Sequence, residues 1–303
     1  MAFIGLLTAL LCSWAAPDQS AQSTPVFVTA SFLDRNRLYL ENLSREEIRV
    51  FENGRPRDVE FLASKEVPTA YGLLWDRSLL PQPFDDPVAG RYGIPIGTAA
   101  TNVAYQLLDQ ALGRYVGWVA AYDSEFHLAM DFTQDTGLIK DTVQQMRGER
   151  LKEEPVLYGA LLTAVKKLSQ RNEKRRLLFV FVDYLDLQTS GKLKPLKNLL
   201  SASNVELFIA SFAASKTASS HGLPPLQSEA SFRELAGVTA GGAFFVLQEG
   251  IEEMGKRISY QAASYYTIGF QAESPPDQPG KLKIECTRPG TKVITHPLVP
   301  ILQ

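Results

Sequence analysis

The sequence predicts an α/β protein in which a Rossmann-like, doubly wound and mostly parallel sheet is inserted into a small β-sandwich. Residues 71–75 and 177–182 are apolar runs without alternation, which is typical of strands that are buried on both faces. Helical periodicities separate these and further strand patterns, and such an order produces a parallel sheet with helices on both faces. Alternating apolar and polar residues near both ends of the chain predict the sandwich.

The composition is that of an ordinary globular protein. The 303 residues are 45% hydrophobic and 21% charged, which suffices for one large domain or for one medium and one small domain. The 31 Lys and Arg residues nearly balance the 33 Asp and Glu residues, giving a net charge of -2. The densest basic cluster, residues 174–176, lies between a helix pattern and a strand and is interpreted as a solvated turn. We therefore expect no nucleic-acid partner.

Residues 1–21 are interpreted as a secretory signal and a polar leader. The apolar run 2–11 is too short to span a bilayer, and Ser13-Trp14-Ala15 places small residues where a signal peptidase cuts. Cys12 would suit a lipid anchor, but Leu11 is not the small residue that such a site requires. No later run predicts a membrane span. We expect a secreted, periplasmic or envelope protein, in which Cys286 is left as a single thiol after cleavage.

Residues 22–67 are predicted to form a small β unit. Asn53-Gly54 favours a type I′ hairpin turn, because both central residues of that turn need positive φ. We expect this turn to join the strand patterns at 48–50 and 59–61. The residues that alternate as in strands with one face in a core are Val26, Val28, Ala30, Phe32, Ile48, Val50, Val59 and Phe61.

Residues 265–303 are predicted to pair with that unit. Alternation returns in 265–272, 282–286 and 292–295, and Pro289-Gly290 separates the last two patterns as a turn would. The N-terminal unit alone is too small to bury much surface. We therefore expect both terminal segments to close into one β-sandwich around an inserted α/β domain.

Residues 68–264 are expected to form that α/β domain. Its strands are predicted at 71–76, 115–122, 126–130, 177–183, 205–212 and 242–247, and the third is expected to form a hairpin with the second. Its helices are predicted at about 98–112, around Ile139 and Val143, around Leu157 and Leu168, at 232–235 and around Met254 and Ile258.

Two of the predicted strands lead into an acid. Asp76, followed by Ser78, ends the first buried strand, and Asp183 follows the run 177–182. Ligands of open α/β sheets bind outside the carboxyl ends of the strands, and two carboxylates there are candidates for a hard cation. Carboxylates at strand ends also cap helices or accept hydrogen bonds from loop amides. Metal binding and a structural role are both open for these two acids.

These residues resemble the von Willebrand factor type A (VWA) domain and its metal-ion-dependent adhesion site. An Asp-x-Ser motif after the first strand, a distant strand closed by Asp, and the flanking runs 28–30, 46–54 and 72–78 are similar to the VWA-related proteins of acidobacteria. The similarity runs from about residue 24 to residue 296. It implies a VWA fold and a protein partner that is recognised at the carboxyl ends of the strands.

The metal motif departs from the family's pattern, which has Asp-x-Ser-x-Ser, a Thr from a second loop, and an Asp. Asp76, Ser78 and Asp183 match this pattern, whereas Leu80 stands in place of the second Ser and Pro155 in place of the Thr. The resemblance therefore implies a degenerate site. Mg²⁺ demands octahedral geometry and would have to take more of its shell from water. We expect no certain cofactor and at most weak binding of Mg²⁺ or another divalent cation.

The predicted partner surface surrounds this degenerate site. The loop 81–97 is longer than the family's usual crossing, and loops on a rigid scaffold often carry function, although it could also pack as a local flap. Three acids of this surface are also the candidates to replace the lost ligands. The surface comprises Asp76, Arg77, Ser78, Phe84, Asp85, Asp86, Tyr92 and Glu154.

The sequence holds no motif of a known catalytic site. His127, His221 and His296 fall in a strand, in a loop and near the C-terminal end, and neither Gly-x-Ser-x-Gly nor His-Glu-x-x-His occurs. We expect an exported, non-enzymatic module that binds a protein. The alternative is a structural module of a larger cell-envelope complex with no ligand at the VWA face.

Overall fold

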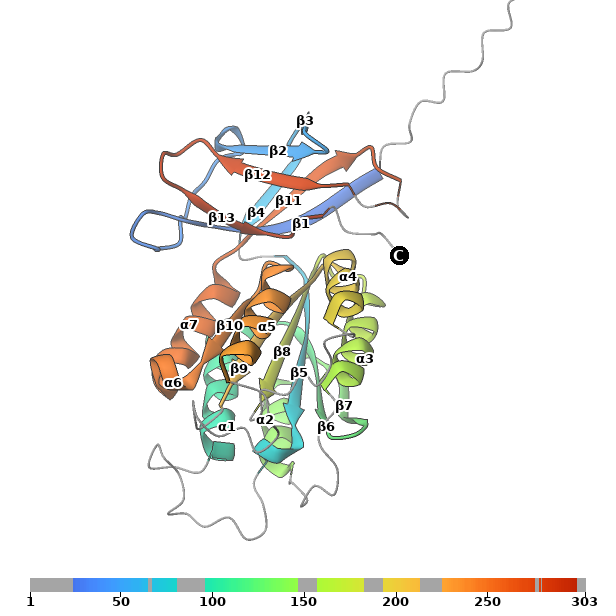
Figure 1. Ribbon diagram of the computed structural model, residues 1–303, viewed down its shortest axis with the longest axis vertical. Coiled ribbons are helices and arrows are strands. Elements are labelled where there is room, and N and C mark those ends of the chain that lie inside the picture. Colours follow the sequence, from blue (N-terminus) through green and yellow to red (C-terminus); the bar gives the residue numbers. More distant parts are fainter. Residues whose placement is uncertain are drawn as a thin grey trace, which may run out of the picture.

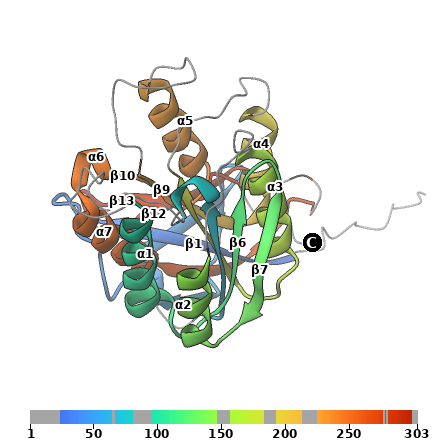
Figure 2. The ribbon, with the colours of Figure 1, turned by 90° about the horizontal axis from the view of Figure 1, so that it is seen from below.

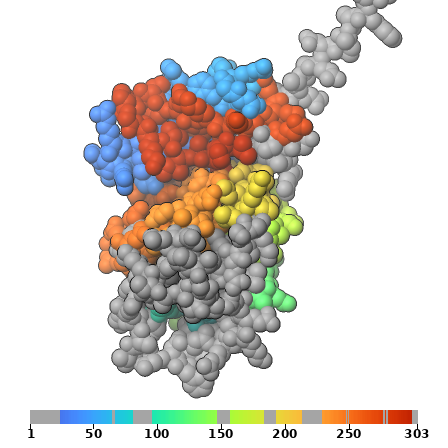
Figure 3. Space-filling model, viewed as in Figure 1, coloured from blue at the N-terminus to red at the C-terminus, as the bar shows by residue number. Residues whose placement is uncertain are grey.

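The structure is a computed structural model that describes residues 24–64, 67–80, 96–146, 157–182, 193–212, 225–275, 278 and 280–298. Figure 1 shows a β-sandwich at one end of the molecule and an α/β body at the other. The two parts are packed directly against each other (Figure 3).

The α/β body is built on a six-stranded sheet with the order β10-β9-β8-β5-β6-β7. All neighbouring strands are parallel except β7, which forms the predicted antiparallel hairpin with β6. The chain adds strands on one side of β5 and then on the other, so the topology switches between β5 and β8 and the predicted doubly wound fold is confirmed. The strands are β5 (Thr69–Asp76), β6 (Val116–Tyr122), β7 (Phe126–Thr133), β8 (Arg175–Val182), β9 (Val205–Ser211) and β10 (Gly242–Phe245).

Helices cover both faces of this sheet (Figure 2). One face packs against α1 (Ile96–Leu107), its π-helical continuation η3 (Leu108–Leu112), α2 (Thr136–Gln145) and α7 (Ile251–Ala263). The other packs against α3 (Leu157–Ser169), α4 (Leu193–Ser203) and α5 (Pro225–Gly237). Leu73 and Leu74 of β5 belong to opposite cores, which explains why its sequence is apolar without alternation. The predicted strand 242–247 ends at Phe245 because α6 (Val246–Glu249) begins there.

The sandwich is shared by the two ends of the described chain. Its sheets have the orders β13-β1-β11-β4 and β12-β2-β3. N-terminal strands pair with C-terminal ones in both sheets, as predicted, and their apolar faces enclose one core. The domain limits at 22–67, 68–264 and 265–303 stay predictions. The elements are β1 (Thr24–Leu33), η1 (Arg45–Glu47), β2 (Ile48–Glu52), β3 (Arg55–Arg57), β4 (Phe61–Ser64), β11 (Tyr266–Ala272), β12 (Leu282–Cys286) and β13 (Lys292–Thr295).

The Asn53-Gly54 turn joins β2 to β3, and the predicted pairing of 48–50 with 59–61 is wrong. Both turn residues have positive φ, 51° and 81°, as a type I′ turn requires. A two-residue turn fixes the register, so Glu52 pairs with Arg55 directly after the turn. Phe61 instead begins β4 in the other sheet, opposite Gly269.

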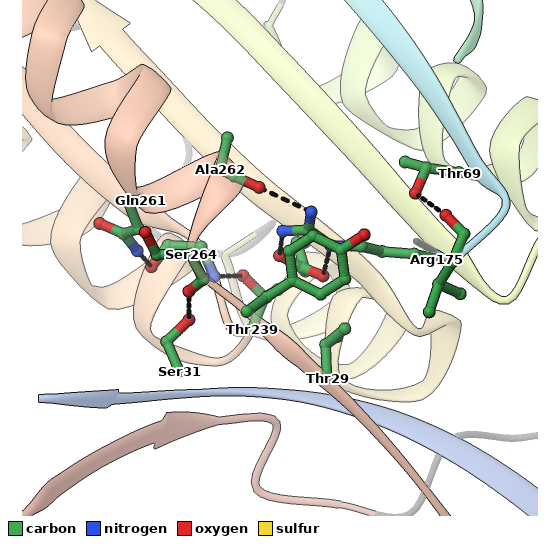
Figure 4. A network of polar contacts seen from close by, with 12 residues as sticks. Thr29, Ser31, Thr69, Arg175, Thr239, Gln261, Ala262 and Ser264 are labelled. Carbon is green, nitrogen blue, oxygen red and sulfur yellow. Dashed lines mark hydrogen bonds and ion pairs between the residues drawn. The ribbon is translucent and has the colours of Figure 1, made fainter. Parts of the chain in front are cut away.

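A buried ion pair lies where the sandwich meets the amino ends of the sheet strands (Figure 4). Arg175 at the start of β8 donates from Nε and Nη2 to the two carboxylate oxygens of Glu206 in β9, both at 2.7 Å. Its Nη1 donates to the carbonyl of Ala262 in α7 at 2.7 Å, and its guanidinium lies 3.5 Å from the ring centre of Tyr265. The expectation of a solvated turn at 174–176 is therefore wrong for Arg175, because a distant carboxylate pairs with it.

Arg175 keeps its proton although water is excluded from it. The side chains of Arg175 and Glu206 are only 1% and 3% exposed. Burial alone would lower the pKa of Arg175, but the Glu206 carboxylate more than offsets this, so the pKa is raised. Nearby, the Ser31 hydroxyl of β1 donates to the carbonyl of Ser264 at 2.7 Å. Asn204 Nδ2 also donates to the carbonyl of Phe27 in β1 at 3.3 Å, so part-buried polar contacts hold the sandwich to the body.

His296 makes the stability of this region depend on pH. Its ring is fully buried, and neither nitrogen has a hydrogen-bond partner. Burial lowers its pKa from 6.5 to about 4, although the charge of Glu206 acts in the opposite direction. The unfolded chain therefore takes up a proton at a higher pH than the folded protein does. The stabilisation is complete above pH 6.5 and is lost as the pH falls through that value towards 4.

We predict that the free energy of unfolding falls by about 3 kcal/mol through His296 as the pH is lowered from 6.5 to 4. Urea unfolding across this pH range measures the loss, and His296→Gln, which does not titrate, serves as the matched control. Carboxylates titrate in the same pH range and contribute equally to both proteins. The prediction therefore concerns how much more unfolding free energy the natural protein loses than the variant. An identical pH dependence in both would contradict the prediction.

Candidate functional site

The candidate site lies at the end of the body that is remote from the sandwich (Figure 1). Asp76 is the last residue of β5, next to the point where the topology switches. Trp75 pairs with Phe181, so Asp76 lies level with Val182, the last residue of β8. The carboxyl ends of β5 and β8 therefore meet at one edge, where ligands of such sheets bind.

The carboxylate of Asp76 caps the short 3-10 helix η2 (Arg77–Leu79). Its Oδ1 accepts hydrogen bonds from the Ser78 amide at 2.9 Å and from the Ser78 hydroxyl at 2.7 Å. Its Oδ2 accepts a hydrogen bond from the Tyr122 hydroxyl at 3.5 Å. The residue is only 1% exposed. This geometry is the structural role that the sequence left open for Asp76, and Ser78 directs its proton to that carboxylate.

The turn after Asp76 is fixed by apolar packing. Leu79 and Leu80 are buried in the same core as Trp75, and the Leu80 amide closes the turn onto the carbonyl of Arg77 at 3.2 Å. In the VWA metal motif that the sequence resembles, the residue at the position of Leu80 is a serine whose hydroxyl is a metal ligand. The side chain found there contributes to the core and has no oxygen to offer a cation.

A charged cluster that the sequence did not predict lies beside this turn. Arg77 donates from Nη1 to Oδ2 of Asp123 at 2.6 Å, and Oδ1 of Asp123 lies 2.8 Å from Nε2 of His127. Asp123 follows β6 in the hairpin to β7, so it is a third acid at the carboxyl end of a parallel strand. An acid directly after a predicted strand was the signal in the sequence that could have identified Asp123 as a site residue.

Asp123 is held as a carboxylate by its neighbours. Burial would raise the pKa of Asp123, but hydrogen bonds from the Glu125 amide, from His127 and from Arg77 outweigh it and lower the pKa to about 2. The side chains of Arg77 and Asp123 are 18% and 16% exposed, and that of His127 is 43% exposed. The cluster therefore presents an ion pair and an accessible imidazole to the solvent.

The structure brings together three of the predicted site residues, Asp76, Arg77 and Ser78. The other predictions fall in segments that the structure does not describe. They concern Asp183, Phe84, Asp85, Asp86, Tyr92 and Glu154, together with Pro155.

The described residues do not by themselves fit a divalent cation. Within the described ranges, no group of three or more His, Cys, Asp or Glu side chains could hold a metal ion. Asp76 and Ser78 supply two oxygen donors, and both are engaged with each other. Mg²⁺ needs a near-octahedral set of oxygen ligands. A metal site at this edge therefore stays a prediction that depends on ligands from other segments.

The sequence matches no family model and no curated protein. Among solved structures, a von Willebrand factor type A protein from Catenulispora acidiphila is similar over 93% of this chain and 74% of its own, with 10% identity and a TM-score of 0.48. An aerotolerance-related membrane protein from Bacteroides fragilis is similar over 64% of this chain and 98% of its own, with 14% identity and a TM-score of 0.48. The SpRpn10 VWA domain is similar over 63% of this chain and 95% of its own, with 14% identity and a TM-score of 0.45.

VWA domains are thus among the solved structures to which this chain is similar. The assignment of the fold itself depends on the sheet topology. Sheet topology and the placement of Asp76 define the class as a doubly wound α/β module that carries a β-sandwich. Among the described residues, no helix is both long and apolar enough to cross a membrane.

We predict that Asp76→Ala lowers the free energy of unfolding by about 2 kcal/mol and Ser78→Ala by about 1 kcal/mol. The first substitution leaves the half-buried amide and hydroxyl of Ser78 without their acceptor, whereas the second removes a single donor. Urea unfolding of both variants measures the difference. A more stable Asp76→Ala protein would indicate that the cap does not offset the desolvation of the carboxylate.

Proposed function

We propose that this chain is an exported, non-enzymatic module that binds a protein partner through the carboxyl ends of its sheet strands. The observation that carries the proposal is the placement of the sandwich. It covers the amino ends of the strands, so the switch-point edge with Asp76 faces away from it (Figure 1). Open α/β sheets bind their ligands at that edge. Export would depend on the signal predicted at 1–21.

The chemistry of this end favours a protein partner. Arg77, Asp123 and His127 form a connected set of charged and polar groups at its surface. Small molecules are usually held in deep clefts, whereas polar surfaces of this kind are typical of protein contacts.

We further propose that partner binding does not depend on a tightly bound metal ion. Asp76 is engaged as a cap, and Leu80 is part of the core. The contact would then be made by Arg77 and Ser78 with Asp123 and His127 beside them, together with the predicted partner residues of the undescribed segments. Asp76 is only 1% exposed, so it would hold this turn in place and would not itself touch the partner. A weak Mg²⁺ site would add to this contact without being required.

A hydrolytic function is not favoured by the described residues. His127 pairs with Asp123, as a catalytic histidine would with its orienting acid. The hydroxyl of Ser78, however, donates to Asp76 and not to an imidazole. The cluster thus lacks the nucleophile that a hydrolase needs.

The alternative is a structural module of a larger envelope complex. The polar contacts that join body and sandwich, Ser31 to the Ser264 carbonyl and Asn204 to the Phe27 carbonyl, favour it, because they would let the body position the sandwich as a rigid spacer. Partner contacts would then lie on the sandwich. The two proposals differ in which end of the molecule the partner covers.

We predict that a photo-crosslinking amino acid at Glu125 captures a partner protein in the producing cells, whereas the same group at Lys283 does not. Glu125 is exposed in the hairpin beside Asp123, and Lys283 is exposed on β12 of the sandwich. Gel shifts and mass spectrometry identify the product. Arg77→Glu should abolish capture at position 125, and EDTA should leave it unchanged.

The reverse pattern, with capture only at position 283, would support the spacer function and contradict binding at the strand ends. Capture at position 125 that EDTA removes would show that the contact requires a metal ion. Capture at position 125 that survives Arg77→Glu would exclude the charged cluster from the contact.

A further inference from the structure

The sandwich faces the body with a row of polar side chains. Along β1, residues of the sandwich core alternate with residues on the opposite face of the strand, which faces the body. Figure 4 shows Thr29 and Ser31 of this opposite face pointing towards the body. The polar residues of the interface are at most 5% exposed, so solvent is excluded around them. They are Thr29, Ser31, Thr267 and His296.

His296 belongs to the sandwich and lies in this row. Thr295 of β13 pairs with Ala30 of β1, so the next residue, His296, lies level with Thr29. Thr267 of β11 pairs with Thr29 from the other side. The three side chains therefore lie across one face of the sheet. Neither ring nitrogen of His296 nor the hydroxyl of Thr267 has a hydrogen-bond partner among the described residues.

The charged groups of the body at this interface are already engaged. Glu206 of β9 acts on the imidazole of His296, but both its carboxylate oxygens accept hydrogen bonds from Arg175 of β8. Lys174, which precedes Arg175, lies 4.0 Å from the ring centre of Phe27 in β1. An imidazolium at this position would therefore compete with Arg175 for the only carboxylate that acts on it in the described part of the chain.

The sandwich strands around His296 do not compensate a positive charge. Burial raises the pKa of Tyr265, just before β11, to about 12, so its hydroxyl stays neutral. Lys292 on β13 is itself a cation and is exposed. The remaining side chains of the row do not titrate. They are Thr29, Ser31 and Thr267. A proton on His296 thus adds a charge to a buried interface, which is unfavourable while the interface is closed.

The interface can open without unfolding either part. Among the described residues, the core of the sandwich shares no residue with the two cores of the body. The hydrogen bonds across the interface include Ser31 to the Ser264 carbonyl and Asn204 to the Phe27 carbonyl. The chain from β4 to β5 and the chain from α7 to β11 would keep the two parts connected. Proteins open in such cooperative units at a lower cost than that of global unfolding.

We propose that protonation of His296 opens this interface, so that the sandwich separates from the body while both parts keep their folds. In the open state water solvates the imidazolium. The pKa of His296 is about 4 in the closed state and returns to 6.5 in the open state, so the ratio of open to closed molecules rises about 100-fold between pH 7 and pH 4. The closed state is favoured most above pH 6.5. This inference does not rest on the proposed function.

Hydroxyl-radical footprinting of the full chain, read by mass spectrometry, tests the opening. The oxidation rate of His296 is divided by its rate in the urea-unfolded protein at the same pH. This ratio should rise about sevenfold between pH 6 and pH 5. Trp118 in the body core and Phe270 in the sandwich core should stay protected.

Two serine substitutions decide whether the opening is local. Ser31→Ala removes a hydrogen bond across the interface and should raise the oxidation of His296 about fivefold at pH 7. Ser78→Ala, the matched control, removes a hydroxyl at the far end of the body. It should leave the oxidation of His296 unchanged, although it lowers the free energy of global unfolding.

Loss of protection at Trp118 and Phe270 together with His296 would overturn the proposal, because the protein would then unfold as a whole. Equal effects of Ser31→Ala and Ser78→Ala would overturn it for the same reason. A rise that begins only below pH 4.5, the ordinary pKa of a glutamate, would assign the opening to carboxylates. Oxidation of His296 that is unchanged from pH 7 to pH 4 would show that the interface does not open.

Discussion

The ion pair between Arg175 and Glu206 is the interaction on which the rest of this structure depends. Removing two charges from water costs several kcal/mol for each, and only good geometry with further hydrogen bonds offsets that cost. Arg175 meets both conditions: it makes two bonds to the carboxylate and a third to the Ala262 carbonyl, and it stacks on Tyr265. A single side chain thereby connects two central strands, the last helix of the body and the entry to the sandwich.

The pair lies at the end of the sheet that the sandwich covers. Arg175 and Glu206 lie near the amino ends of β8 and β9, and the sandwich is joined to the body there. The carboxyl ends of the strands therefore lie at the opposite end, where Asp76 caps its turn and Arg77 meets Asp123. Arg175 also stacks on the ring of Tyr265, at the point where α7 leads into β11 of the sandwich.

Much of the fold could be predicted because it depends on local patterns. The run that forms β5 is apolar on both faces and therefore predicts a central strand, and alternation near both ends predicts the sandwich strands. The hairpin partner of β2 was predicted wrongly because alternation at 59–61 does not reveal which sheet a strand joins. Arg175 was assigned to a solvated turn because its partner is distant in sequence.

The candidate site was predicted only in part, because some of its contacts are local in the sequence and others are not. Asp76 and Ser78 are two residues apart, so their contact follows from a local turn motif. The contact of Arg77 with Asp123 joins two different strand ends, and neither residue type reveals it in the sequence. Contacts between distant residues depend on strand order, which the sequence alone does not determine.

A double-mutant cycle at the ion pair tests the central claim most directly. Arg175→Met, Glu206→Leu and the double variant are compared with the natural protein by urea unfolding. The account predicts that each single substitution lowers the free energy of unfolding by about 3–5 kcal/mol, because it leaves a buried charge unpaired. The double variant should lose far less than the sum, with a coupling of about 2 kcal/mol or more. Losses that simply add, or single losses below about 1 kcal/mol, would contradict the account.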